Sequence, residues 1–412
     1  MTPISSRDYS LLILNYYFSL PISPYLEPTM KKLLFSLAIL SCATCFSQDL
    51  AFGRKMVDTL TSPTFWGRGY TKDGMKKAAD FLAAQFQSFG LKPLKGNSYL
   101  QPFSYPANTF PGKMNLSING KELVPGKDYI VSPDSRGVKG KGSFRQVDSA
   151  QFIDDKKRVI IKLEDKLTWS VAPEAADYTM IEVDKKAITG QPQTFEANIE
   201  NKLIPSFAAS NIAGYVKGTT KPDSFIFITA HYDHLGGMGS DTYFPGANDN
   251  ASGDALLLNL ARYYAQHPQP YSIGFIFFAG EEAGLIGSKY YTDHPLVPLK
   301  NIRFLINTDL AGTGEEGITV VNATEFPAEF ALLQNINKEA HLLAAVNARG
   351  KAANSDHYFF SEKGVPAFFF YTLGGTKAYH DVFDRAETLP LNEHEHLFQL
   401  LLLFNNRLMG VK

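Results

Sequence analysis

The chain has almost no cysteine. Only two of its 412 residues are cysteines, Cys42 and Cys45, and both lie near the N-terminus. If that segment is removed from the mature protein, disulfides, thiolate ligands and cysteine nucleophiles are excluded, and any metal must be held by His, Asp and Glu. An excess of charge of one sign is also lacking. The formal net charge of −1 gives no reason to expect nucleic acid or an acidic membrane as a partner.

Long apolar runs are absent beyond the N-terminus, so we expect no integral membrane span in the mature protein. From Met30 a short basic stretch, an apolar stretch and small residues follow one another, which is typical of a secretory signal peptide. We therefore interpret residues 1–48 as a leader and signal peptide and expect export, to the periplasm or beyond. A buried or anchoring helix is the alternative, and small residues before Cys42 and Cys45 also allow a lipoprotein anchor.

The rest of the chain changes character twice. The composition is that of a globular protein, and the length suits two or three average domains or one large domain with an insertion. Residues 49–92 look helical. The stretch 75–91 has apolar residues at helical spacing, with Gly90 as the stop signal. Asn-Gly and Pro-Gly turns between short strands follow. We therefore divide the chain into a domain start at 49–105, a β-rich insertion or accessory domain at 106–200, and a main part at 201–412.

The main part alternates apolar runs with helical segments. The runs are rich in Ile, Phe and Val without alternation, which indicates strands buried on both faces. We expect an α/β fold, a mostly parallel mixed sheet covered by helices on both faces, with a small β-rich insertion. The runs occupy 224–230, 272–279, 302–307 and 366–371, and the helices occupy 251–266, 327–340 and the stretch from Asn392.

Polar residues gather where these runs end. In open α/β sheets, ligands bind beyond the carboxyl ends of the strands. The four runs lead to His231, Asp233 and His234, to Glu281 and Glu282, to Asp309, and to His380, and Asp249 lies in a glycine-flanked loop before a helix.

Each of these residues has an ordinary structural interpretation when taken alone. A His or Asp after a strand is usually a turn or capping residue, the macrodipole favours glutamates at a helix start, and Asp249 fits a helix N-cap. Together, however, the acids would repel one another without a cation. A set of imidazoles and carboxylates suits Zn²⁺. The combination therefore predicts a metal site.

The motifs AHYDHLG (230–236), PGANDNASG (245–253), FAGEEAGLIGS (278–288), NTDLAG (307–312) and AYHD (378–381), in this order, resemble metallopeptidase family 28. The resemblance is strong over 201–385 and looser over 60–100. It implies a zinc exopeptidase fold and two zinc ions per chain. Residue by residue, it implies that one zinc is bound by His231 and Asp309, the other by Glu282 and His380, and that Asp249 bridges them.

The resemblance also implies the catalytic roles. Glu281 matches the general base, which takes a proton from water activated by the two metals and later delivers it to the leaving amine. Asp233 matches the carboxylate that orients His231 by accepting a hydrogen bond from its remote ring nitrogen. The segment after His380, DVFDRAETL, departs from the Thr-Pro-rich version of relatives, which puts the nearby pocket wall in doubt.

Other polar residues give weaker signals. Asp356 and His357 resemble a family segment near the substrate pocket, and Tyr371 ends a core strand, so all three are candidate substrate-binding residues. Ser355, Asp356 and His357 cannot form a catalytic triad, since three consecutive side chains do not easily converge. We interpret His234 as structural, with a contact to a metal ligand as the alternative. His394 and His396 are expected to be solvated on the C-terminal helix.

The function that follows is an exported zinc aminopeptidase that removes N-terminal residues from peptide substrates. A carboxypeptidase or a glutaminyl cyclase of the same fold is an alternative. A non-catalytic, receptor-like binding module is a third class, and the intact ligand set argues against it. The sequence does not indicate the oligomeric state, the native metal or the preferred N-terminal residue.

Overall fold

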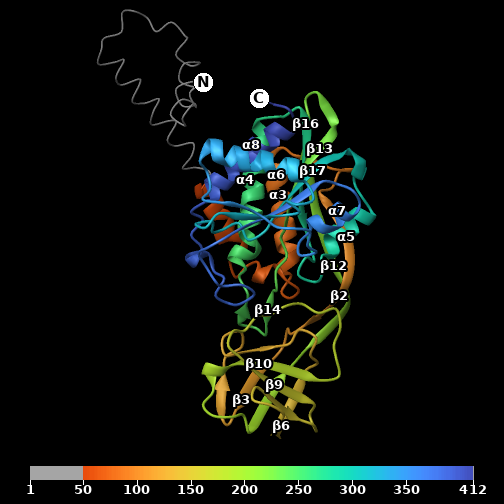
Figure 1. The fold of residues 1–412 in the computed structure, drawn as a ribbon. Helices are drawn as coiled ribbons and strands as arrows, with labels where there is room; N and C mark the ends of the chain where they lie inside the picture. Colours follow the sequence, from red (N-terminus) through yellow and green to blue (C-terminus); the bar gives the residue numbers. More distant parts are fainter. Residues whose placement is uncertain (1–49, 412) are drawn as a thin grey trace, which may run out of the picture.

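The computed structural model describes residues 50–411 and divides into a large α/β part and a smaller β-rich part (Figure 1). The signal peptide expected from Met30 and the two cysteines lie outside the described residues. Within residues 50–411, no helix combines the length and the apolar character needed to cross a membrane.

A nine-stranded mixed sheet forms the centre of the large part. Its strands are β1 (Lys92–Pro93), β2 (Leu100–Thr109), β12 (Lys202–Val216), β13 (Lys221–His231), β16 (Tyr271–Phe278), β17 (Ile302–Thr308), β18 (Ile318–Val321), β19 (Val346–Ala348) and β20 (Ala367–Thr372). They lie in the order β1-β12-β16-β13-β17-β20-β18-β19, and β2 pairs with β12. The adjacent strands β16, β13, β17 and β20 are parallel. This confirms the expected fold class.

Helices cover both faces of the sheet, and alternate residues of each strand face them. In β13, Ile226 and Ile228 join the larger apolar cluster, whereas Phe225 and Phe227 join the cluster on the opposite face. Helices α3, α4, α6 and α8 contribute to the first cluster, and α5 and α7 to the second. The helices are α3 (Gly74–Phe89), α4 (Gly253–Gln266), α5 (Ile286–Asp293), α6 (Pro327–Ala340), α7 (His357–Glu362) and α8 (His394–Leu408), with 3-10 turns at Trp66–Arg68, Lys185–Ala187, Leu299–Asn301 and Ala386–Thr388.

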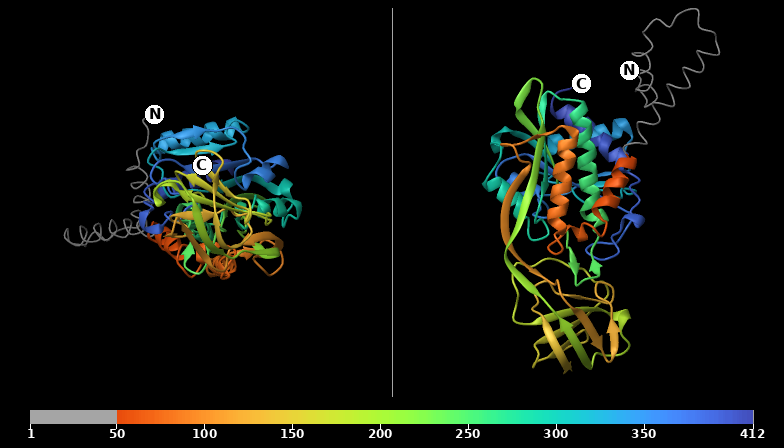
Figure 2. Two further views of the ribbon diagram at one scale, coloured as in Figure 1. Left: turned by 90° about the horizontal axis from the view of Figure 1, so that it is seen from below. Right: turned by 180° about the vertical axis from the view of Figure 1, so that it is seen from behind.

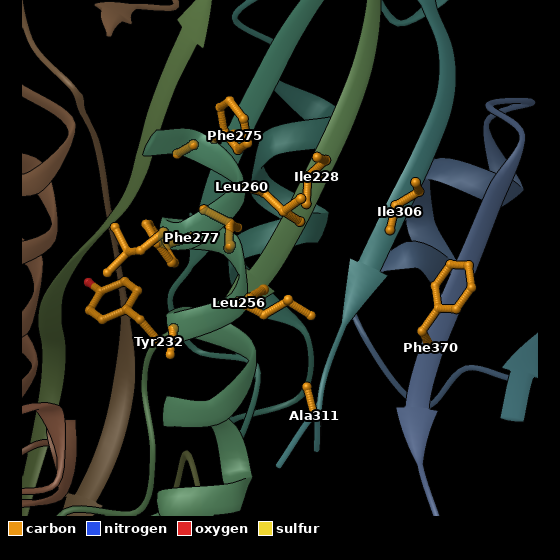
Figure 3. Close-up of a cluster of buried hydrophobic side chains, with 14 of the residues drawn as sticks. Ile228, Tyr232, Leu256, Leu260, Phe275, Phe277, Ile306, Ala311 and Phe370 are labelled. Carbon is orange, nitrogen blue, oxygen red and sulfur yellow. The ribbon is translucent and has the colours of Figure 1, made fainter. Parts of the chain in front are cut away.

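Helix α4 is anchored to the sheet by fully buried leucines (Figure 3). Leu256 and Leu260 lie against Ile228 of β13 and Phe275 and Phe277 of β16. Burial of each such side chain contributes about 1.5–3 kcal/mol. The irregular segment Ala247–Ser252 leads directly into this helix. Packing of α4 therefore also fixes the loop that carries Asp249.

The start of the large part is less helical than the sequence suggests. Residues 50–60 and α3 are helical, but the residues between them form turns and a 3-10 turn. Helix α3 ends as predicted, because Gly90 adopts a left-handed conformation with φ 80° and its N–H bonds to Gln87.

The smaller part consists of two sheets at the lower end of the molecule in Figure 1. Its strands are β3 (Met114–Ile118), β4 (Lys121–Leu123), β5 (Tyr129–Val131), β6 (Val138–Ser143), β7 (Arg145–Gln146), β8 (Gln151–Asp154), β9 (Val159–Glu164), β10 (Thr179–Asp184) and β11 (Thr194–Ile199). One sheet has the order β5-β10-β9-β8-β7 and the other β4-β3-β11-β6. We call this part, residues 110–201, the accessory unit.

The accessory unit is joined to the large part by the long strands β2 and β12, which run side by side between the two parts (Figure 2). A hairpin of the large part, β14 (Gly237–Met238) and β15 (Thr242–Tyr243), reaches the accessory unit. Its Met238 and the adjoining Phe244 belong to the same apolar cluster as Phe110 and Trp169. The two parts therefore share a core.

Candidate metal centre

The predicted ligands come from consecutive strand ends of the large sheet. His231 is the last residue of β13, Glu282 follows β16 after a short turn, and Asp309 follows β17 directly. His380 lies in the loop after β20, and Asp249 lies in the segment before α4. Parallel strands place their carboxyl ends at one edge, which is why residues so far apart in sequence meet.

The five side chains converge around the Asp249 carboxylate. Its Oδ1 lies 3.4 Å from Nε2 of His231, and its Oδ2 lies 3.1 Å from Nε2 of His380. Nε2 of His231 is also 3.3 Å from Oδ1 of Asp309, and Nε2 of His380 is 3.1 Å from Oε2 of Glu282. Asp249 thus separates two pockets, each closed by one imidazole and one further carboxylate.

The chemistry of these pockets fits a divalent cation. Nε2 of His231 and Oδ1 of Asp309 are buried and face each other, yet neither has a hydrogen-bond partner. Burial would lower the pKa of the His380 imidazole, but Glu282 and hydrogen bonds to Asp249 and Glu282 outweigh it and raise the pKa to about 11. Burial likewise opposes a charged His231, but Asp309 and Glu281 prevail and raise its pKa, so positive charge is favoured at both imidazoles. A metal with mixed N and O ligands such as Zn²⁺ would supply it.

The two adjacent glutamates differ in their electrostatic surroundings. Burial raises the pKa of Glu281 well above its usual value, and the carboxylates of Glu282, Asp356 and Asp309 add to this effect. Burial and Asp249 also act to raise the pKa of Glu282, but His380 and a hydrogen bond from His234 prevail and lower it to about 2. Glu282 is therefore suited to a permanently ionised ligand and Glu281 to a group that exchanges protons.

Glu281 faces the pocket of His231 and Asp309. One ligand atom from each of these three residues lies within 4.8 Å of the others. A second group with this spacing contains His234, Asp249 and Glu282. His234 Nδ1 lies 2.7 Å from Oε1 of Glu282, the oxygen that does not face His380. The alternative interpretation of His234, a contact to a ligand, is thus the one that the structure favours.

Asp233 is near His231 but contacts it differently from our expectation. Nδ1 of His231 lies 3.1 Å from the main-chain carbonyl of Asp233, while the nearest carboxylate oxygen is 3.8 Å away. The carboxylate instead accepts hydrogen bonds from the main-chain N–H groups of Glu281 and Glu282. Asp233 therefore positions both the histidine and the glutamate pair, through separate atoms.

The three candidate substrate-binding residues are not equally accessible. Asp356 and His357 are fully buried, and burial raises the pKa of Asp356 to about 6. Tyr371 is half-buried, and its hydroxyl accepts a hydrogen bond from Arg349. The neighbouring Ser355 donates to Oδ2 of Asp309 at 3.4 Å, which links this segment to the metal centre.

Several supporting residues carry no recognisable sequence signal. The Asp384 carboxylate accepts hydrogen bonds from the N–H groups of Asn248 and Asp249. The fully buried Arg68 binds main-chain carbonyls of the Asp249 loop. Tyr379 is 42% exposed and stacks on the His380 ring with centroids 4.0 Å apart. Only the positions of Tyr379 and Asp384, beside and shortly after His380, could have drawn attention to them.

Comparisons with solved structures show the class of fold. The peptidase M28 precursor from Shewanella amazonensis SB2B aligns with TM-score 0.68 and 16% identity, over 90% of this chain and 96% of that chain. A zinc aminopeptidase from Bacillus subtilis aligns with TM-score 0.65 and 19% identity, over 87% of this chain and 94% of that chain. The chain therefore has the fold of these proteins.

Sequence comparisons match the main part of the chain to one family. A model of peptidase family M28 matches residues 211–404, and these residues belong to that family. Aminopeptidase YwaD of Bacillus subtilis is 30% identical over 186 residues, 44% of this chain and 39% of the relative. A probable zinc metalloprotease of Pyrenophora teres is 31% identical over 32% of this chain and 28% of the relative. The chain thus spans well under half the length of these relatives. A probable leucine aminopeptidase of Arthroderma otae is 24% identical over 89% of this chain and 96% of the relative.

Proposed function

We propose that this protein is a zinc-dependent aminopeptidase that hydrolyses N-terminal residues from peptides. One observation carries the proposal. The two oxygens of the Asp249 carboxylate face different imidazoles, His231 and His380, at 3.4 and 3.1 Å. A carboxylate that faces two imidazoles, with one further acid beside each imidazole, suits a pair of divalent cations. His231 and Asp309 would hold one zinc, Glu282 and His380 the other.

Glu281 is the proposed general base. Zinc held by these residues would supply Lewis-acid chemistry, which lowers the pKa of water and polarises a carbonyl. The Glu281 carboxylate would accept the proton of the attacking water and pass it to the leaving amine. Its raised pKa supports this role, because the group must hold the proton between the two transfers. Asp233 would keep Glu281 in place through the bond from the Glu281 N–H.

The names of the relatives favour an aminopeptidase over the alternatives. Both YwaD and the Arthroderma otae protein are named aminopeptidases. We further propose that the protein is exported by the signal peptide that begins at Met30, which the sequence pattern supports. Peptides in the periplasm or outside the cell would then be its substrates.

Replacement of Glu281 by Gln tests the proposal. The variant keeps the size of the side chain but cannot accept a proton, so hydrolysis of aminoacyl anilides should fall by about 10²–10⁴-fold or more. Zinc content should remain about two per chain, since Glu281 is not a proposed ligand. Glu339→Gln, at an exposed position of α6, is the matched control and should behave as the unaltered protein. Hydrolysis retained in Glu281→Gln would refute the base assignment.

A substrate panel separates the remaining alternatives. An aminopeptidase cleaves peptides with a free amino terminus and loses activity when that terminus is acetylated. Cleavage that depends on a free carboxyl terminus would instead indicate a carboxypeptidase. Cyclisation of N-terminal glutamine by protein with a single zinc would indicate a cyclase. Zinc binding without any turnover would indicate a binding module.

A further inference from the structure

The accessory unit makes direct contact with one of the two ligand histidines. The main-chain carbonyl of Trp169 lies 2.8 Å from Nδ1 of His380, and the Trp169 N–H donates to the His380 carbonyl at 2.9 Å. Trp169 belongs to the loop between β9 and β10, so this pair joins the accessory unit to the metal-binding loop. Both the ring and the backbone of His380 are held by the same residue.

The Trp169 side chain fixes the position of that carbonyl. Its indole N–H donates to the Val131 carbonyl of β5 at 2.8 Å, inside the five-stranded sheet. Its ring stacks on Phe244 with centroids 4.7 Å apart and planes at 25°. Phe244 immediately precedes the loop that carries Asp249. Trp169 is therefore packed between the accessory core and the metal centre.

A second contact from the same loop supports the first. The Lys166 ammonium donates to the Lys377 carbonyl at 3.0 Å and lies 3.6 Å from Oδ2 of Asp381. The Asp381 carboxylate in turn accepts hydrogen bonds from the N–H groups of Tyr379 and Phe383, on both sides of His380. His380 itself has φ 53°, a conformation that a non-glycine residue adopts only when its surroundings hold it there.

The other ligand histidine does not depend on the accessory unit. Nδ1 of His231 lies near the carbonyl of Asp233, two residues away in the same strand-end segment of the large sheet. A metal-binding imidazole needs a partner for its remote nitrogen, because that bond fixes the tautomer and the ring orientation. For His231 the large part supplies this partner. For His380 the accessory unit supplies it.

We propose that Trp169 is a positioning residue through which the accessory unit sets the affinity of the metal held by His380, Glu282 and Asp249. The inference rests on the proposed two-metal site. It predicts that loosening Trp169 weakens the second metal selectively, since the ligands of the first are oriented within the large part. Loss of a comparable outer hydrogen bond typically weakens metal binding by 10–100-fold.

Metal binding by the full chain tests the inference. Zinc is titrated against a competing chelator for the unaltered protein, Trp169→Leu and Phe195→Leu. Phe195 is equally buried in the accessory unit but stacks on Phe144, away from His380. In Trp169→Leu we expect the dissociation constant of the site that contains His380 to rise by roughly 10–100-fold, so that one of the two constants changes and the other does not. Phe195→Leu should keep both constants.

Lys166→Ala provides a second variant in case Trp169→Leu fails to fold. Lys166 is half exposed, so the variant should fold, and the dissociation constant of the site that contains His380 should rise by less than in Trp169→Leu. Two zinc ions bound with unaltered affinity in both variants would overturn the inference, as would equal weakening in Phe195→Leu. If the unaltered protein fails to bind two zinc ions, the proposed function falls instead, so the two failures are distinguishable.

Discussion

His394 is buried at the start of α8, where we had expected a solvated histidine. It is 1% exposed, and its Nε2 lies 2.8 Å from the side-chain amide of Asn259 in α4. The prediction was wrong because helical periodicity does not reveal which turn of a helix faces another helix. His396, two residues on, is exposed as expected, and its Nδ1 contacts the Glu393 carboxylate.

Burial of His394 has a consequence for stability in acid. Burial lowers its pKa from 6.5 to about 4, with a minor contribution from Arg54. Below pH 6.5 the unfolded chain binds a proton that the native state does not, so stability falls as the pH drops towards 4. The full effect of this one group is about 3 kcal/mol.

Replacement of His394 by Gln should therefore reduce the loss of stability between pH 6.5 and 4. Gln retains an acceptor for Asn259 but does not titrate in this range. The free energy of unfolding, measured at several pH values for both proteins, should fall less steeply in the variant. Parallel curves would show that the native state binds this proton as readily as the unfolded chain.

The loop 245–249 is held in place by Arg68, which belongs to a different element and is the last residue of the 3-10 turn Trp66–Arg68. Its guanidinium donates to five main-chain carbonyls: those of Leu60, Tyr232, Pro245, Gly246 and Asp249. The Arg68 side chain is fully buried. One planar side chain thus provides hydrogen-bond donors to a loop that lacks regular hydrogen bonding.

Arg68→Lys should weaken both stability and metal binding. Lysine keeps the charge but has three donors, so at least two buried carbonyls lose their partners, at about 1–3 kcal/mol each. Arg54→Lys is a suitable control, because Arg54 also binds three carbonyls, of Ala386, Leu389 and Pro390, but none in this loop. Thermal unfolding should change in both variants and zinc affinity only in Arg68→Lys. Unaltered zinc affinity in Arg68→Lys would contradict the role of Arg68 in positioning the loop 245–249.

Gly246 determines how the same loop turns. It has φ 61°, and a Cβ there would lie 2.2 Å from the Asp249 carbonyl and 2.4 Å from the His234 ring. Gly246→Ala should therefore displace Asp249, the proposed bridging ligand, and lower zinc content. In Gly90→Ala, where φ is 80° and nothing lies within 4 Å, only backbone strain of about 1–2 kcal/mol is expected. Zinc content should therefore fall in Gly246→Ala, where the added Cβ collides with neighbouring atoms, and stay the same in Gly90→Ala, where only the positive φ is unfavourable.

At the scale of the whole molecule, the candidate metal centre joins segments far apart in the chain. If zinc binds only the folded protein, free zinc at 1,000 times the dissociation constant adds about 4 kcal/mol to the free energy of unfolding. Removal of metal by a chelator should lower the melting temperature, and added zinc should restore it. A melting temperature that does not respond to either treatment would argue against metal binding at the centre.

The sequence predicted the large sheet and the converging side chains because buried strands and the residues after them leave a local pattern. Glu282 and Asp309, for example, can be placed from the apolar runs that precede them. Contacts through the main chain leave no such pattern. The bond from His231 to the Asp233 carbonyl depends on how the chain turns after β13, and the pairing of Trp169 with His380 depends on how two distant backbones meet, so no residue type records either contact.

The accessory unit leaves and re-enters the large part at neighbouring points. Thr109 at the end of β2 is paired with Lys202 at the start of β12, and the Thr109 hydroxyl donates to the Lys202 carbonyl. A short turn between these two residues would close β2 and β12 into a simple hairpin. The whole unit could therefore be exchanged for another without changing the strand order of the large sheet. Each exchange would also replace Trp169, whose carbonyl contacts the His380 ring.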